Sequence, residues 1–186
     1  PNPSFSLQPS PSFLPMCGIC GLLVPHSLPD RDLLRRMNDG LIHRGPDDEG
    51  YYAGDGVGLA ARRLSIIDVA GGHQPLSNED GTVWITYNGE IYNHELLRAE
   101  LEMHGHAFRT HSDTEMVVHA YEQWGEQCVT RFRGMFAFGL WDERARRLFL
   151  ARDRFGVKPL YYGQTGNRFL FASEIKPILA EGSLSS

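Results

Sequence analysis

Short apolar runs separated by turn residues recur along this sequence, and they limit what the chain can fold into. Each run has the length and composition of a β-strand, and several are joined by connections of hairpin length, which favours antiparallel pairing. The predicted strands are residues 19–24, 57–61, 64–69, 83–87, 135–141, 148–151, 160–162 and 169–172. Because long crossovers between them are few, two antiparallel sheets flanked by helices are the simplest architecture.

Three helices are predicted between these strands. Asp30 can cap the first helix, whose apolar residues share one face at helical spacing. Residues 94–104 are predicted to form the second helix. The third is predicted to begin after Ser112, because Glu115 follows three residues later in the pattern of a capping box, and to end at Gly125.

Composition and charge narrow the classes of partner. The chain has 186 residues, which suits one sizeable domain with a tail. Acidic residues outnumber basic ones by 23 to 18, and no apolar run approaches the ~18 residues of a membrane span, so neither nucleic acid nor a membrane is expected as a partner. The cysteines are odd in number and sparse, which indicates a reducing compartment and a cytoplasmic location. They are Cys17, Cys20 and Cys128.

Residues 1–15 differ from the rest of the chain, because they hold five of its eleven prolines, four serines and no charged residue. This composition predicts a disordered leader, since a secretory signal would need a basic start and a continuous apolar stretch. Met16 resembles an initiator methionine, and residues 1–16 are assigned to the leader. Residues 17–186 are assigned to one domain, and removal of Met16 would make Cys17 its first residue.

A cysteine at the first position of a chain carries both a thiol and a free α-amine. The pKa of such an amine is ~8, well below the ~10.4 of a lysine side chain, so the amine can serve as the base that activates the thiol. Cys17 is therefore a candidate nucleophile. The alternative is that Cys17 is an inert packing residue, since cysteine is among the most buried residue types.

Three other positions have both a structural and a functional interpretation. Asn88-Gly89 at the end of an apolar run first predicts a type I′ hairpin turn, and the same geometry would let the Asn88 amide and the Gly89 N–H donate to an oxyanion. Arg63 is either a surface residue or a bidentate clamp for a carboxylate. Asp113 lies at the start of the third helix, where it either stabilises the helix terminus or holds a substrate ammonium.

No metal or nucleotide site is predicted from the sequence. The glycine-rich segment 54–58 lacks the spacing of a phosphate loop and predicts a hairpin turn. The acidic run 47–49 is typical of a solvated loop. The histidines lack the spacing of zinc ligands, and the single Cys-x-x-Cys pair is weak support for redox chemistry. No cofactor is therefore expected in this chain.

Several motifs that follow one another in a fixed order are more specific than these single residues. They are Met16-Cys17-Gly18-Ile19, His43-Arg44-Gly45-Pro46-Asp47, Arg63-Leu64-Ser65-Ile66-Ile67-Asp68, Tyr87-Asn88-Gly89-Glu90-Ile91-Tyr92-Asn93, Ser112-Asp113, Gly134-Met135-Phe136-Ala137-Phe138 and Ala151-Arg152-Asp153-Arg154-Phe155-Gly156. In this order they resemble the N-terminal glutaminase domain of the glutamine-dependent asparagine synthetases, which are class II glutamine amidotransferases. The resemblance extends from Met16 to about residue 180.

The resemblance implies an N-terminal nucleophile hydrolase fold, which is an α+β fold with a four-layer α/β/β/α sandwich of two antiparallel sheets. It also implies hydrolysis of L-glutamine to glutamate and ammonia through a thioester on Cys17, with the α-amine assisting proton transfer. Asn88 and the Gly89 N–H would form the oxyanion hole.

By the same resemblance, the remaining site residues would bind the amino-acid part of glutamine. Arg63 would bind its α-carboxylate, and Glu90 and Asp113 would bind its α-ammonium. The pocket would also be lined by backbone of Arg63, Leu64, Ser65, Ile66 and Ile67.

The resemblance has further implications for a longer protein. An ATP-dependent synthetase domain is expected to follow this domain or to be a separate subunit, and ATP and Mg²⁺ are expected only there. The ammonia would serve asparagine synthesis from aspartate, or amidation of another carboxylate, in a full-length enzyme that forms a homodimer. If residues 1–16 were retained, the nitrogen of Cys17 would be an amide and the domain would be inactive. The alternative function is then a non-catalytic glutamine-binding or assembly module.

Overall fold

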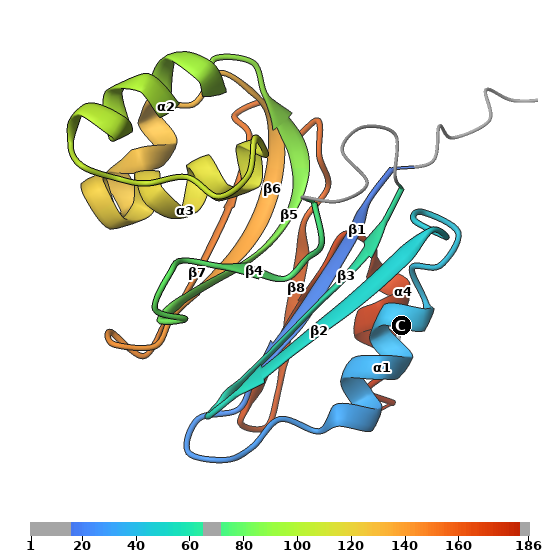
Figure 1. The fold of residues 1–186 in the computed structure, drawn as a ribbon. Helices are drawn as coiled ribbons and strands as arrows, with labels where there is room; N and C mark the ends of the chain where they lie inside the picture. Colours follow the sequence, from blue (N-terminus) through green and yellow to red (C-terminus); the bar gives the residue numbers. More distant parts are fainter. Residues whose placement is uncertain (1–15, 65–71, 183–186) are drawn as a thin grey trace, which may run out of the picture.

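The fold is a sandwich of two antiparallel sheets with helices on both outer faces, as Figure 1 shows. It is seen in a computed structural model that describes residues 16–64 and 72–182. The order of layers is helix, sheet, sheet, helix, so the predicted α+β four-layer architecture is confirmed. No helix in these two ranges is long and apolar enough to cross a membrane.

The first sheet has β1 at its centre. Its strand order is β2 (Asp48–Gly54), β3 (Val57–Arg63), β1 (Gly18–Leu23), β9 (Arg168–Ala172) and β8 (Tyr161–Thr165). β1 is apolar and pairs with β3 on one side and β9 on the other, so its register is fixed by both neighbours. Because Cys17 directly precedes β1, the sheet holds this residue at the end of its central strand.

The second sheet faces the first and is built around a long hairpin. Its strand order is β4 (Leu76–Ser77), β5 (Val83–Ile91), β6 (Gly134–Asp142) and β7 (Arg147–Arg152). β5 and β6 pair along their whole length. β4 is only two residues long, and therefore it leaves most of the outer edge of β5 uncovered by a strand.

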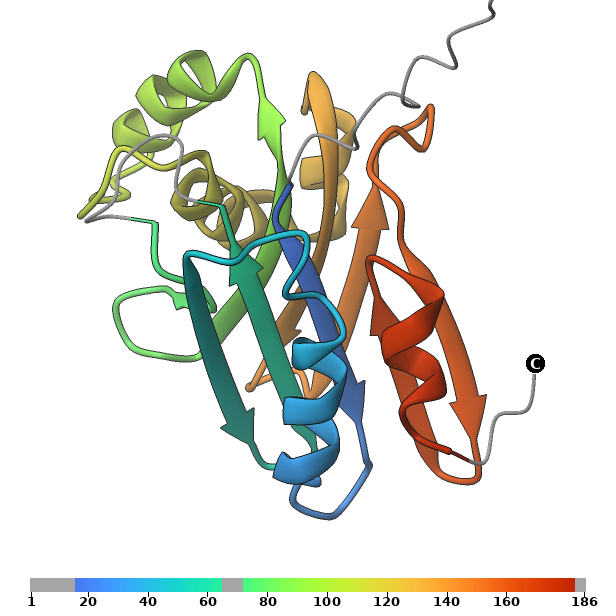
Figure 2. The same ribbon diagram turned by 90° about the vertical axis from the view of Figure 1, so that its right-hand side faces the viewer.

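Helices cover the outer face of each sheet. α1 (Arg31–Asp39) and the short α4 (Ile175–Leu179) lie side by side on the first sheet, as Figure 2 shows. α2 (His94–Met103) and α3 (Asp113–Trp124), with a 3₁₀ helix at Gly125–Thr130, lie on the second. The predicted caps are present, because Asp30 accepts from the N–H of Leu33 at 2.9 Å and Ser112 accepts from that of Thr114 at 3.1 Å.

Three apolar layers hold the sandwich together, one between the sheets and one beneath each pair of helices. The middle layer includes Ile19, Leu59, Trp141 and Phe171, which are almost completely buried. Thr86 Oγ1 donates a 3.0 Å hydrogen bond to the carbonyl of Ala60 across this layer, which ties β5 to β3. The two sheets therefore keep a fixed relation where the site is built.

The structure differs from the sequence-based expectations at several elements. β2 begins at Asp48, where a solvated loop was expected, because Glu49 pairs with Arg62 at 2.7 Å and Asp48 with His73 at 2.9 Å. β4 and α4 were not predicted. The strand predicted at residues 64–69 begins at Leu64, which lies outside β3, and its remaining residues lie outside the described part of the chain.

Candidate active site

A pocket of about 440 Å³ opens where Cys17, the end of β3, the second half of β5 and the start of α3 meet. Its lining includes every predicted site residue that the structure describes. These are Cys17, Arg63, Leu64, Asn88, Gly89, Glu90 and Asp113. Ser65, Ile66 and Ile67 lie outside the described residues.

The backbone of Cys17 is held by Arg44, which the sequence analysis quotes within a motif but does not assign to the site. Arg44 is buried, and its Nε donates to the Cys17 carbonyl at 3.2 Å while its Nη1 donates to Glu174 Oε1 at 2.9 Å. On the other side of β1, the N–H of Ile19 donates to Ser173 Oγ at 3.0 Å. The Cys17 side chain is partly exposed and lines the pocket, so it is accessible to a small molecule there.

Met16 also lies in the pocket. Its sulfur is 3.1 Å from the Nζ of Lys158, and both residues belong to the lining. In a chain that contains Met16, the nitrogen of Cys17 is an amide with no lone pair available to accept a proton. Removal of Met16 would free both this nitrogen and the space that the methionine side chain fills.

Asn88 and Gly89 lie within β5, so the hairpin turn expected there is wrong. The glycine is explained instead by the approach of the neighbouring strand. A Cβ on Gly89 would lie 2.5 Å from the carbonyl oxygen of Met135 and 2.6 Å from the Cα of Phe136, so no larger residue fits beside β6. The dipeptide therefore reflects close strand packing at the pocket.

Alternation along β5 decides which backbone groups face the pocket. The N–H of Tyr87 donates to Gln74 Oε1 at 2.7 Å, and the N–H of Ile91 donates to Asp113 Oδ2 at 3.0 Å. N–H groups two residues apart in an antiparallel strand point to the same side, so these positions point away from β6. Gly89 lies midway between them, and its N–H is therefore directed to the edge of β5 where the pocket lies.

The Asn88 side chain points to the opposite face of the strand from Tyr87, toward the first sheet. It shares this face with Thr86, which hydrogen-bonds to β3. Asn88 is 3% exposed, and its Nδ2 has no hydrogen-bond partner among the described residues. A buried donor without a partner costs about 1–3 kcal/mol, so this position suits an acceptor that arrives with a bound molecule.

Arg63 is the last residue of β3, and it brings a guanidinium to the pocket. A Cβ added to Gly72, which also lines the pocket, would collide with this guanidinium. Gly72 therefore leaves the space that the arginine side chain occupies. A guanidinium presents several N–H donors in one plane and matches a carboxylate in two parallel hydrogen bonds.

Asp113 begins α3 and is fixed by two donors from β5. Tyr87 Oη donates to Asp113 Oδ2 at 2.6 Å, and the same oxygen accepts from the N–H of Ile91. Burial raises the pKa of Tyr87 well above its usual value, and the negative charge of Asp113 raises it further. Together with Glu90, Asp113 gives the pocket two carboxyl groups that can face an ammonium.

Several pocket residues were not predicted as site residues, among them Tyr87 and Lys158. Tyr87 lies in a quoted motif and Lys158 follows another by two residues, yet neither has a local pattern that distinguishes a pocket residue from a surface or core residue. Only the fold brings Lys158 to Met16, which is 142 positions away in the sequence.

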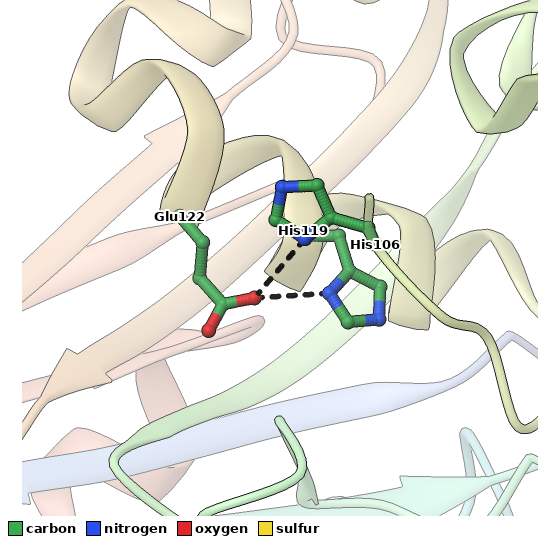
Figure 3. A group of neighbouring side chains, drawn as sticks. All are labelled: His106, His119 and Glu122. Atoms are coloured by element: carbon green, nitrogen blue, oxygen red, sulfur yellow. Dashed lines mark hydrogen bonds and ion pairs between the residues drawn. The ribbon is translucent and has the colours of Figure 1, made fainter. Parts of the chain in front are cut away.

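A second polar cluster, shown in Figure 3, lies outside the pocket lining. His119 Nδ1 is 2.9 Å from Glu122 Oε2, and His106 Nδ1 is 3.8 Å from the same oxygen. Asn78 Nδ2 donates to the other Glu122 oxygen at 2.7 Å. Burial alone would raise the pKa of Glu122, but hydrogen bonds from His119 and Asn78 outweigh it and lower the pKa. The ligand atoms of His106, His119 and Glu122 lie within 4.8 Å of one another, which is close enough to hold a metal ion, although the sequence spacing did not suggest one. The contacts among these side chains also account for the cluster.

Comparison with known proteins shows which sequences and structures this chain resembles. The sequence matches the family model of the glutamine amidotransferase domain over residues 16–186. It is 47% identical over 168 residues to asparagine synthetase [glutamine-hydrolyzing] 1 of Bacillus subtilis, covering 88% of this chain and 27% of that protein. It is 45% identical over 167 residues to asparagine synthetase [glutamine-hydrolyzing] 2 of Arabidopsis thaliana, covering 88% and 28%. The chain thus spans little more than a quarter of the length of these relatives.

Among solved structures, the fold is similar to that of the glutamine phosphoribosylpyrophosphate amidotransferase from B. subtilis. The TM-score is 0.73 with 23% sequence identity, and the match covers 89% of this chain and 44% of that one. At this level of identity the similarity concerns the fold alone, and it supports the sandwich of two antiparallel sheets between helices.

Proposed function

Because this chain belongs to the glutamine amidotransferase domain family, we propose that it hydrolyses the side-chain amide of glutamine to glutamate and ammonia, with Cys17 as the nucleophile. One observation carries the proposal. The partly exposed Cys17 shares a pocket with the buried Nδ2 of Asn88, which has no partner among the described residues. A nucleophile and an unoccupied donor in one pocket are two of the parts that acyl transfer requires.

In the proposed mechanism, the α-amine of Cys17 takes the thiol proton as the sulfur attacks the amide carbon of glutamine. The oxyanion that forms accepts hydrogen bonds from Asn88 Nδ2 and the N–H of Gly89. The carbon–nitrogen bond then breaks, and the protonated α-amine gives its proton to the leaving ammonia. Water hydrolyses the glutamyl thioester, with the α-amine again acting as the base, and glutamate is released.

The remaining pocket residues are proposed to select a free amino acid. Arg63 would bind the α-carboxylate in a bidentate pair, and Glu90 and Asp113 would bind the α-ammonium. Their presence in one pocket supports these roles, because an amino acid carries one group of each charge. The backbone of residues 63–67 is proposed to complete the wall.

The fate of the ammonia is proposed from the relatives. Their names describe glutamine-hydrolysing asparagine synthetases, and each is much longer than this chain. We therefore propose that the ammonia is passed to an ATP-dependent synthetase part that converts aspartate to asparagine, and that ATP and Mg²⁺ bind there. A cytoplasmic location and a homodimeric full-length enzyme are parts of the same proposal.

The test compares two forms of the protein, one beginning at Cys17 and one retaining Met16, with both masses verified. The proposal predicts that the first form releases glutamate and ammonia from glutamine in equal amounts and that the second releases neither. Glutamine binding without hydrolysis by the first form would contradict the enzymatic proposal and favour the non-catalytic binding module.

A further inference from the structure

Lys158 is a buried cation in the pocket to which the glutamine-hydrolysis scheme gives no task. Its side chain is largely shielded from solvent, with 7% of the residue exposed. Its Nζ contacts the sulfur of Met16, and a thioether is only a weak acceptor. An ammonium group buried beside such a partner is costly to retain, so its position calls for a reason.

The backbone around Lys158 is rigidly held, so the cation is directed to this place by the fold. Asp153 is a buried carboxylate that follows β7, and its two oxygens accept from three backbone N–H groups in the loop after it. The donors are Phe155 at 3.1 Å, Val157 at 2.9 Å and Lys158 at 3.0 Å. Burial alone would raise the pKa of Asp153, but these N–H groups outweigh it and keep the pKa below the usual value.

The contact with Met16 brings Lys158 to the residue that immediately precedes the nitrogen of Cys17. Met16 is bonded directly to that nitrogen, and its side chain reaches Lys158 Nζ. Removal of Met16 takes away the thioether and leaves an α-amine separated from the lysine ammonium by no more than the span of one methionine residue plus the 3.1 Å contact. A like charge at such a distance disfavours protonation of the amine.

Charged groups in the pocket lining and next to Cys17 would raise or lower the pKa of the same amine. Arg44 contacts the Cys17 carbonyl, and its positive charge acts in the same sense as that of Lys158, although it is also paired with Glu174. The other titratable groups in the lining are Arg63, Tyr87, Glu90, His94, His111 and Asp113. The carboxylates of Glu90 and Asp113, which the substrate ammonium requires, would raise the pKa of the α-amine, and a cation near the amine opposes this effect.

We propose, on the basis of the function proposed above, that Lys158 is a positioning residue whose positive charge keeps the α-amine of Cys17 in its neutral, proton-accepting form. Its action on the reaction passes through this amine, because a deprotonated amine is what the thiol needs as its base. Lys158 thereby offsets the pocket carboxylates without occupying the place of the substrate ammonium.

The proposal can be tested by substitutions at the two lysines of the chain. Among its 18 basic residues only Lys158 and Lys176 are lysines, and Lys176 is exposed on α4. Lys158→Met removes the charge at similar length, and Lys158→Gln removes it should the methionine prevent folding. Lys158→Arg keeps the charge, since arginine stays protonated at any accessible pH. Lys176→Met is the matched control for loss of a lysine.

The first measurement is the reactivity of the Cys17 α-amine toward acetic anhydride as a function of pH, read by mass spectrometry of the N-terminal peptide. It uses the protein beginning at residue 17 with the Cys17→Ala substitution in every variant, because an acetyl group on an N-terminal cysteine thiol migrates to the α-amine. It needs no glutamine turnover, so it can fail independently of the proposed enzymatic function. In Lys158→Met the titration midpoint is expected to rise by roughly one pH unit. In Lys158→Arg and Lys176→Met it is expected to stay within a few tenths of a unit.

The second measurement is the pH profile of kcat/KM for glutamine hydrolysis. Loss of the charge is expected to move the acidic limb of the profile to higher pH by the same amount, with activity recovering in alkaline solution. A purely structural lysine would lower activity equally at every pH and leave the midpoint in place. An unmoved α-amine midpoint in Lys158→Met, or an equal shift in Lys158→Arg, would overturn the proposal.

Discussion

Tyr87 donates a 2.6 Å hydrogen bond from its hydroxyl to Oδ2 of Asp113, and this contact ties β5 to the start of α3 at the pocket. The same carboxylate oxygen also accepts from the N–H of Ile91. Because burial and the charge of Asp113 keep the pKa of Tyr87 far above neutral, the hydroxyl remains a donor throughout the working range of pH. The orientation of the Asp113 carboxylate on α3 therefore depends on a side chain from β5.

Tyr87→Phe removes this donor while keeping the ring. The variant is expected to raise the KM for glutamine several-fold with little change in kcat, because Asp113 would still be charged but less well placed for the substrate ammonium. Steady-state kinetics would check this. Tyr121→Phe is the matched control, since Tyr121 donates to Asp142 at 3.0 Å outside the pocket lining. An equal rise in KM in both variants would contradict the assignment.

Asn88→Ala removes the donor proposed for the oxyanion. The kcat for glutamine hydrolysis is expected to fall by ~10² to 10³ with a smaller effect on KM, because the hydrogen bond strengthens as charge develops on the carbonyl oxygen. The free energy of unfolding is expected to change little, since the Nδ2 atom has no partner to lose among the described residues.

Asn78→Ala is the control, and the opposite pattern of stability and kcat is expected for it. Asn78 donates to Glu122 and to Thr82, and its carbonyl oxygen accepts from two backbone N–H groups. This variant is expected to lower the free energy of unfolding and to leave kcat unchanged. An unaltered kcat in Asn88→Ala would exclude Asn88 from the oxyanion hole.

Arg63→Lys keeps the positive charge but loses the planar pair of donors. Its expected effect is a raised KM for glutamine, because a lysine cannot make two parallel hydrogen bonds to a carboxylate. The neighbouring Arg62 is the comparison. It is buried and pairs with Asp39 at 2.6 Å and Glu49 at 2.7 Å, so Arg62→Lys is expected to lower the melting temperature without raising KM. An unchanged KM in Arg63→Lys would show that Arg63 has a structural role.

The lowered pKa of Glu115 predicts how the free energy of unfolding depends on pH. Burial would raise its pKa, but donors from the Thr110 hydroxyl and from the N–H groups of Arg109 and Thr110 outweigh it and lower the pKa. A carboxyl whose pKa is lower in the folded state contributes stability above its unfolded pKa of ~4.3, and this contribution is lost as the pH falls further.

Between neutral pH and pH 3.5, the free energy of unfolding should therefore fall less in Glu115→Gln than in the unsubstituted protein. At neutral pH the variant is expected to be less stable by roughly 1.5–3 kcal/mol, since hydrogen bonds to a charged group are replaced by weaker ones. Urea unfolding at neutral pH and near pH 3.5 would measure both effects. A constant difference between the two proteins at both pH values would contradict the role given to the carboxylate.

Local signals in the sequence were sufficient to predict most of the fold. Asp30 and Ser112 cap α1 and α3 as expected, because capping depends on residues a few positions apart. Glu115 was expected to complete a capping box, but its carboxylate instead accepts from Arg109 and Thr110 before the helix. β2 was missed because its acidic residues are stabilised by Arg62 and His73, which are distant in sequence.

The candidate site was predictable in its residues and less so in its geometry. Asn88-Gly89 has the composition of a hairpin turn, and only the approach of β6 explains why a glycine lies within a strand. Arg44 and Lys158 reach the site through contacts that no local pattern encodes. The motifs therefore identified the pocket and its Arg63, while the tertiary structure added Arg44 and Lys158 and the direction of the donors.

The most direct test of the account is to trap the acyl intermediate. Protein beginning at Cys17 would be mixed with glutamine, quenched in acid and analysed by intact and peptide mass spectrometry. The account predicts a transient increase by the mass of one glutamyl group, located on the sulfur of Cys17 and absent from Cys17→Ala. A glutamyl group on another residue, or continued hydrolysis of glutamine by Cys17→Ala, would contradict it.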